Sequence, residues 1–269
     1  MIWRIILIGL GSLAPFMVGA LESGKNDWEP IFNGKDLSGW DTYLDGQGKN
    51  NDPNRIFQVN NGVIHVYKNN QHGQNAAFGY ISTIKEYSNY HLRFQYKWGA
   101  KKFGHRVNKK RDSGVLYHVV GKDMIWPTSV ENQIQEGDTG DIFTIATRIT
   151  TTVDPTKEHT NDKSFYKEKG KIHTQGTKGY TRVIKSAMHE NSNWNTVEVI
   201  VKGSSAVHII NGRINNRCED INMSVPGFLS RWTPLVSWEP LDKGKIAFQA
   251  EGAEIFYRNI EIKSLGVSL

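Results

Sequence analysis

The stretch YHLRFQYKW, residues 90–98, alternates large apolar residues with polar residues over nine positions. Side chains of a β-strand point in turn to its two faces, so the apolar members would share one face. This face would carry Tyr90, Leu92, Phe94, Tyr96 and Trp98. The alternation therefore predicts a strand with one face in a hydrophobic core and the other face toward water.

Short strands are expected along most of the chain after residue 20. Residues 57–59 and 63–66 flank an Asn61-Gly62 pair, which favours a tight hairpin because both residues tolerate positive φ. No stretch after residue 20 shows a convincing helical period. The pattern predicts one all-β domain over residues 21–269, a sandwich of two antiparallel sheets. The further expected strands are 115–120, 130–135, 197–202, 207–210, 245–250 and 254–262.

Two long segments, 155–178 and 215–243, do not follow the strand rhythm and are expected to be loops. The second segment contains Trp232 and Trp238. Indole rings in such a loop can stack on the apolar face of a sugar ring, or they can pin the loop to the sheet. Both interpretations stay open for these two tryptophans.

The first 20 residues resemble a secretory signal, with Arg4 before an apolar stretch and small residues at its end. We expect cleavage near Ala20, and an uncleaved anchor is the alternative. Cys218 is the only cysteine, so no intrachain disulfide can form. We expect an exported bacterial protein, periplasmic or extracellular, with no membrane attachment beyond the signal. The net charge of +6 is a mild excess, and its densest run, residues 101–111, has the pattern of an exposed loop. We expect no nucleic-acid partner.

The run ENQIQEGD, residues 131–138, places carboxylates beside amides within an expected strand. Regular alternation would put Glu131, Gln133 and Gln135 on one face and Glu136 on the other. A β-bulge, made easy by Gly137, would bring Glu131 and Glu136 to the roughly 5 to 10 Å that separates paired glycosidase carboxylates. The alternative is a solvated polar strand face followed by an acidic turn.

Six segments together resemble the 3-keto-disaccharide hydrolase domain family. This family is similar in fold to concanavalin-like lectins and laminarinase-type glucanases. The resemblance implies a jelly roll of two antiparallel sheets with a concave substrate face. The segments are IFNGKDLSGW at 31–40, DSGVLYHV at 112–119, ENQIQEGDTGD at 131–141, WNTVEVIVKG at 194–203, INGR at 210–213 and IAFQAEGAEIFYRNIEIK at 246–263.

The resemblance also implies a reaction. Retaining glucanases carry Glu-x-Asp-x-x-Glu, whereas this chain has Glu131-x-Gln133-x-x-Glu136, and a neutral middle residue removes the electrostatic tuning of the two glutamates. The family implies cleavage of glycosides oxidised to a ketone at C3, by elimination across C1 and C2 and then hydration. A conventional glucan hydrolase and a non-catalytic carbohydrate-binding module are the alternatives.

Under this hypothesis the partner is an oligosaccharide or glycoside, and no cofactor is required by the sequence. A divalent cation at Asp138 and Asp141 is possible but not assigned, and the oligomeric state stays open. The expected acid/base residues are Glu131, Glu136 and, as a third candidate on the same sheet face, His118. The expected substrate-binding residues are Gln133, Gln135, Asp138, Gln249, Glu251, Arg258, Trp232 and Trp238.

Overall fold

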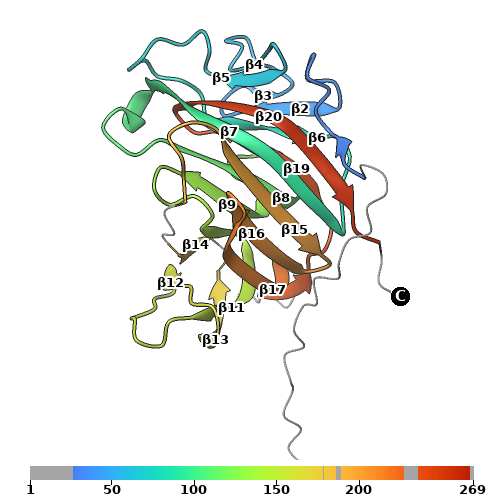
Figure 1. Ribbon diagram of the computed structural model, residues 1–269, viewed down its shortest axis with the longest axis vertical. Helices are drawn as coiled ribbons and strands as arrows, with labels where there is room; N and C mark the ends of the chain where they lie inside the picture. Colours follow the sequence, from blue (N-terminus) through green and yellow to red (C-terminus); the bar gives the residue numbers. More distant parts are fainter. Residues whose placement is uncertain (1–26, 178, 186–188, 227–235, 267–269) are drawn as a thin grey trace, which may run out of the picture.

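A computed structural model describes residues 27–177, 179–185, 189–226 and 236–266. The expected signal, residues 1–20, and Trp232 lie outside these residues. The described residues form two sheets that lie one behind the other, with β7 and β15 in front of β8 and β9 in Figure 1. Within this part of the chain no helix has the length and apolar character needed to cross a membrane.

The first sheet has 11 strands. β7 and β20 lie next to each other at its centre, and β1 and β18 pair with β20 and β17. The path runs through β13 (Lys171–Gly176), β11 (Thr147–Val153), β17 (Arg213–Pro226), β16 (Ser205–Ile210), β15 (Asn195–Lys202), β7 (Tyr90–Lys102), β20 (Ala253–Ser264), β5 (Val63–Val66) and β4 (Phe57–Asn60), with β1 (Glu29–Pro30) and β18 (Val236–Pro240) beside it.

The second sheet has nine strands, with β9, β8 and β19 at its centre. Among the pairings of the described residues, only β12 with β14 is parallel. A 3-10 helix, η1 (Gly104–Arg106), lies between β7 and β8. The order is β12 (Lys163–Phe165), β14 (Tyr180–Ile184), β10 (Ile142–Ile145), β9 (Thr128–Gln135), β8 (Asp112–Val120), β19 (Lys245–Ala250), β6 (Gly79–Thr83), β2 (Trp40–Leu44) and β3 (Gly48–Lys49).

The expected sandwich and its main strands are confirmed. In β7 the apolar residues from Tyr90 to Tyr96 are buried and the polar residues between them are half-buried, as the alternation predicts. The Asn61-Gly62 hairpin forms with φ of 49° and 76°, so both residues adopt the left-handed conformation that this tight turn requires.

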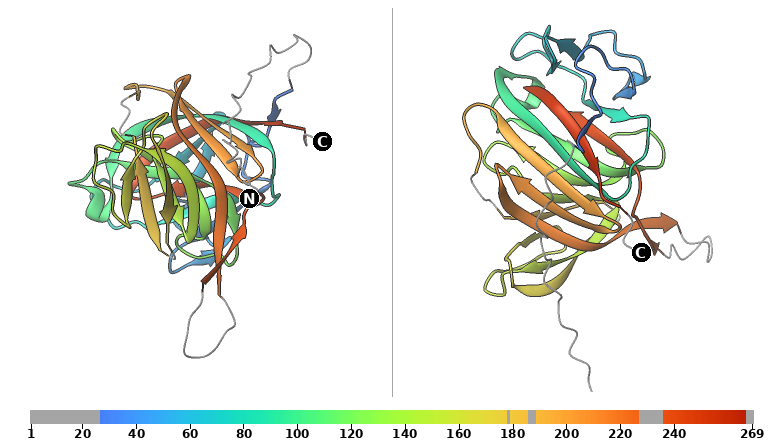
Figure 2. Two further views of the ribbon diagram at one scale, coloured as in Figure 1. Left: turned by 90° about the horizontal axis from the view of Figure 1, so that it is seen from below. Right: turned by 45° about the vertical axis from the view of Figure 1, so that its right-hand side comes forward.

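The two expected loops are wrong in part. The segment 155–178 contains the short strands β12 and β13, and the segment 215–243 contains most of β17 and all of β18. β17 shows no apolar alternation because Asn215 and Asn216 are both fully buried in it. Figure 2 shows the end of β17 and its partner β18 projecting from the body of the sandwich.

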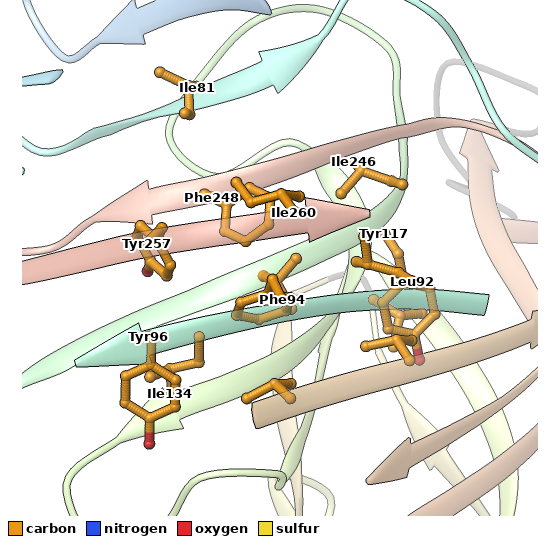
Figure 3. Packing of buried hydrophobic residues seen from close by; sticks show 14 of the residues in the cluster. Ile81, Leu92, Phe94, Tyr96, Tyr117, Ile134, Ile246, Phe248, Tyr257 and Ile260 are labelled. Carbon is orange, nitrogen blue, oxygen red and sulfur yellow. The ribbon is translucent and has the colours of Figure 1, made fainter. Parts of the chain in front are cut away.

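The core lies between the two sheets and is rich in aromatic rings (Figure 3). Phe248 of β19 packs against Phe94 of β7 and Tyr257 of β20, with ring centroids 4.9 and 5.0 Å apart. The Tyr257 hydroxyl is 2.6 Å from the Ser113 hydroxyl of β8, which adds a polar link between the sheets. These contacts fix the inner face of the second sheet, so its other face is free for chemistry.

We expect Phe248→Ala to lower the free energy of unfolding by about 3–5 kcal/mol, because the surrounding rings cannot fill the cavity left by the lost ring. Urea denaturation followed by tryptophan fluorescence measures this change. Ile84→Ala is the control, since Ile84 is 58% exposed and its truncation should change the free energy by less than about 0.5 kcal/mol. Equal effects of the two substitutions would contradict the assigned core.

Candidate active site

Strand β9 separates two environments across its thickness. Val130 and Ile134 belong to the core between the sheets, whereas Glu131, Gln133 and Gln135 line a cavity on the outer face of the second sheet. β9 pairs with β8 without a register shift from Gln135 to Val130. The regular alternation of a strand is therefore enough to bring three polar side chains of β9 to one face.

The cavity has a volume of about 380 Å³, which is within the range of small-molecule sites, roughly 300–1,000 Å³. β8, β9, β10, β14 and β19 supply residues to it, together with η1 and the loops after β8 and β19. Its lining residues are Arg106, Asp112, Ile125, Trp126, Glu131, Gln133, Gln135, Phe143, Tyr180, Gln249 and Glu251.

Asp112 organises the polar floor of the cavity. The amide of Gln133 donates a hydrogen bond of 2.8 Å to Oδ1 of Asp112, and the amide of Gln135 donates one of 2.7 Å to Oδ2. Arg106 forms an ion pair of 2.5 Å with the same Oδ2. A single buried carboxylate therefore holds the two glutamines of β9 and one arginine in fixed positions.

Arg106 also pairs with Oε1 of Glu251, the residue after β19 that follows Ala250. The guanidinium thus bridges two carboxylates from different strands. Burial raises the pKa of Glu251 to about 8, with the charge of Asp112 acting in the same direction and Arg106 opposing it. Burial likewise raises the pKa of Asp112 to about 6, against the charge of Arg106.

Glu131 is a third buried acid of the cavity, with 5% of its surface exposed. Burial raises its pKa well above the usual range, and the charges of Glu251 and Asp112 raise it further. Its Oε1 and the Oε1 of Gln249 have no hydrogen-bond partner among the described residues. This surrounding favours the protonated form of the Glu131 carboxyl.

Gly114 of β8 leaves the space that Glu131 and Gln249 occupy. A Cβ atom at this position would overlap Oε1 of both side chains. Position 114 is opposite Gln133 in the register of β8 and β9, so the missing side chain opens the middle of the cavity floor. The glycine is therefore required by packing, not by backbone conformation.

The expected bulge between Glu131 and Glu136 is wrong, because the register of β9 is continuous over these residues. Glu136 follows the strand and pairs with Arg111, with 2.8 Å between Oε1 and Nη2. Its side chain is 43% exposed, and hydrogen bonds from Arg111 lower its pKa. Glu136 does not line the cavity that contains Glu131.

His118 also lies away from the cavity. The register of β8 and β9 shifts between Tyr117 and Val120, and His118 adopts a φ of 53°. The irregularity breaks the alternation that would have placed His118 beside Leu116, and its Nε2 lies 3.2 Å from the carbonyl oxygen of Gly203. The imidazole is fully buried, and burial lowers its pKa to about 4.

The other expected binding residues divide into two groups. Gln249 and Glu251 line the cavity, as expected from their shared parity. Asp138 pairs with Lys110 at 2.6 Å, Arg258 stacks on Trp194 at 3.8 Å, and Trp238 of β18 lies 4.7 Å from the guanidinium of Arg148. None of these three lines the cavity.

Sequence reasoning missed several cavity residues. Asp112 could have been found, because it shares parity with Gly114, and the structure pairs it with Gln135 across β8 and β9. Arg106 lies in the basic run 101–111, which was expected to be a solvated loop. Its side chain is half-buried and pairs with two acids. Trp126, Phe143 and Tyr180 come from segments for which no strand or site was expected.

Within the described ranges, no group of three or more His, Cys, Asp or Glu residues has an arrangement that could hold a metal ion. Asp138 and Asp141, the expected cation candidates, both pair with Arg182, at 3.5 and 2.7 Å. The polar groups of the cavity are instead suited to hydrogen bonding and proton transfer with a small polar ligand.

Comparison with known proteins agrees with this fold. A solved structure of a candidate glycosyl hydrolase from Parabacteroides distasonis has a TM-score of 0.50 and 22% identity, covering 89% of this chain and 94% of that chain. A second such structure from the same organism has a TM-score of 0.48 and 21% identity, covering 88% and 99%. A β-glucanase from Bacillus licheniformis has a TM-score of 0.42 and 12% identity, covering 90% and 99%. No curated protein matches the chain.

The family match over residues 27–263 places this jelly-roll sandwich, with its cavity of acids and amides, in a carbohydrate-active class of protein. The family model of the 3-keto-alpha-glucoside-1,2-lyase-like domain matches residues 27–263. The chain belongs to this family.

The raised pKa values make a stability prediction with a defined sign. A buried acid with a raised pKa keeps its proton in the folded state when the unfolded chain has lost it, so stability falls as pH rises above about 4.5. We expect Glu131→Gln to increase the free energy of unfolding more at pH 8 than at pH 4, because the glutamine amide does not have to bind a proton that the unfolded chain has lost at pH 8.

The same substitution should have little effect at pH 4, where Glu131 is protonated in both states. Urea denaturation at the two pH values measures the difference. Equal effects at pH 4 and pH 8 would show that the Glu131 carboxyl does not carry a raised pKa.

Proposed function

We propose that this protein cleaves glycosides that carry a ketone at C3 of the sugar, by base-initiated elimination followed by hydration. One observation carries the proposal: Glu131 and Glu251, both with pKa values raised by burial, lie in a single cavity with one arginine. Membership of the 3-keto-alpha-glucoside-1,2-lyase-like family supports a keto-sugar substrate. The glycosyl hydrolase relative from Parabacteroides distasonis supports glycoside cleavage in general.

Glu251 is the proposed base. A ketone at C3 acidifies the hydrogen on C2, and a base whose pKa is near the working pH removes such a proton most effectively. The pKa of Glu251, raised by burial to about 8, meets this condition. As the proton leaves, the electron pair of the C2–H bond moves toward the ketone oxygen, and the nearby positive charge of Arg106 favours the enolate.

Glu131 is the proposed acid. The enolate collapses to form the C1–C2 double bond, and the C1–O bond breaks with its electron pair on the aglycone oxygen. A protonated Glu131, favoured by burial, can donate its proton to this oxygen. Water then adds across the double bond, with hydroxide at C1 and a proton at C2, which completes a net hydrolysis.

The amides of the floor orient the sugar. Gln133 and Gln135 donate to Asp112 and therefore present fixed carbonyl oxygens, while Gln249 has an oxygen without a partner among the described residues. Such prepositioned groups suit the hydroxyls of a pyranose ring. Export of the protein to the periplasm or the exterior stays part of the proposal and depends on residues 1–20.

The reaction is tested with a 3-keto α-glucoside in heavy water. We expect the purified protein to release the aglycone and to leave deuterium at C2 of the product, because the C2 proton is exchanged for one from solvent. Mass spectrometry and proton NMR follow both events, with a sample without protein as the control. Release without deuterium at C2, or preferred release of reducing ends from unoxidised laminarin, would contradict the elimination.

The residue roles are tested with matched Glu→Gln variants. Glu131→Gln and Glu251→Gln should each lower kcat on the order of 10² to 10⁴, because each removes one proton-transfer group. Glu136→Gln should turn over like the wild type, since its side chain pairs with Arg111 outside the cavity. Initial-rate assays measure kcat for the three variants. Wild-type turnover by Glu131→Gln would remove Glu131 from the mechanism.

A further inference from the structure

The cavity is not uniform along its length. Its charged end is formed by Arg106, Asp112 and Glu251. Apolar and aromatic residues line the same cavity without a role in the proton transfers, namely Ile125, Trp126, Phe143 and Tyr180. These four residues come from β10, β14 and the loop between β8 and β9, whereas the charged residues come from η1, β8 and the loop after β19.

The strand register places Glu131 at the junction of the two halves. Phe143 of β10 is the direct cross-strand partner of Glu131 on one side, and Leu116 of β8 is its partner on the other. In β9 the next residues of the same face, Gln133 and Gln135, lead toward Asp112. A proton on Glu131 is therefore available to an oxygen that lies between the charged end and the aromatic residues.

The aromatic residues are held in place by contacts outside the cavity. Trp126 packs against the apolar cluster of Tyr80, Leu116, Val119, Ile145 and Ala247. The guanidinium of Arg182 lies 5.2 Å from the Phe143 ring and is itself fixed by Asp141 at 2.7 Å. Rings that are fixed before binding lose little conformational entropy when a ligand stacks on them.

Tyr180 is the clearest indication of a ligand. It lies on β14, opposite Ile145 of β10, and lines the cavity. Its surface is 52% exposed. The other cavity aromatics, Trp126 and Phe143, are half-buried. An amphipathic ring at the rim of a polar cavity matches the apolar face of a sugar ring or an aryl group.

We propose that Trp126, Phe143 and Tyr180 form the aglycone subsite, and that the substrates are 3-keto glycosides with a ring-shaped aglycone, pyranosyl or aryl. This inference rests on the proposed function for the orientation of the substrate. The keto sugar occupies the charged end, its glycosidic oxygen lies at Glu131, and the aglycone ring stacks in the aromatic end. A short alkyl aglycone makes no contact there.

The test compares phenyl and methyl 3-keto α-glucosides as substrates of Tyr180→Ala. Loss of one stacking ring should lower kcat/KM for the phenyl substrate about 3- to 10-fold and leave the methyl substrate within about twofold of wild type. Tyr180→Phe should restore the phenyl rate, because it keeps the ring. Phe256→Ala is the control, since this half-buried ring is on β20 of the other sheet, against His65.

Equal losses on both substrates, or no loss on either, would overturn the aglycone subsite while the elimination itself stands. A binding experiment separates the two proposals. Titration calorimetry with unoxidised phenyl and methyl α-glucosides should show tighter binding of the phenyl compound to the wild type and no such preference in Tyr180→Ala. If this preference is seen in a protein that releases no aglycone, the subsite stands and the proposed reaction falls.

Discussion

Strand β9 has a hydrophobic core on one face and a polar cavity on the other, so the thickness of one strand separates these environments. Val130 and Ile134 pack between the sheets, while Glu131 and Gln133 reach the cavity. A shift of one residue in the register would bury the acids in the core and expose the apolar side chains. The pairing of β9 with β8 and β10 sets its register, and the aromatic contacts of Phe248 with Phe94 and Tyr257 hold the two sheets together.

The polar face of the second sheet brings three acids into one cavity with one arginine. Glu131, Asp112 and Glu251 line one cavity, and Arg106 is the cation that contacts two of them. Burial raises the pKa values of all three carboxyls, and the charges of neighbouring carboxylates raise those of Glu131 and Glu251 further. The result is graded: the pKa of Asp112 is raised to about 6, that of Glu251 to about 8 and that of Glu131 well above its usual range.

The sandwich and half of the site follow from local patterns in the sequence. The alternation of residues 90–98 is periodic, and the parity of Gln249 and Glu251 correctly placed both in the cavity. The predictions failed for β17 and Arg106, where the local alternation of residues does not determine the structure. Asn215 and Asn216 are buried amides, so β17 lacks the apolar alternation by which a strand is predicted. Arg106 of η1 pairs with Asp112 and Glu251, and Glu251 lies far from it in the sequence.

The neutral residue at position 133 has a physical explanation in this arrangement. The amide of Gln133 donates to Oδ1 of Asp112, a bond that a carboxylate at the same position could not make. An aspartate there would add a fourth acid to a cavity in which Arg106 already serves two. The charges of Glu251 and Asp112, which lie outside β9, raise the pKa of Glu131 beyond the effect of its burial.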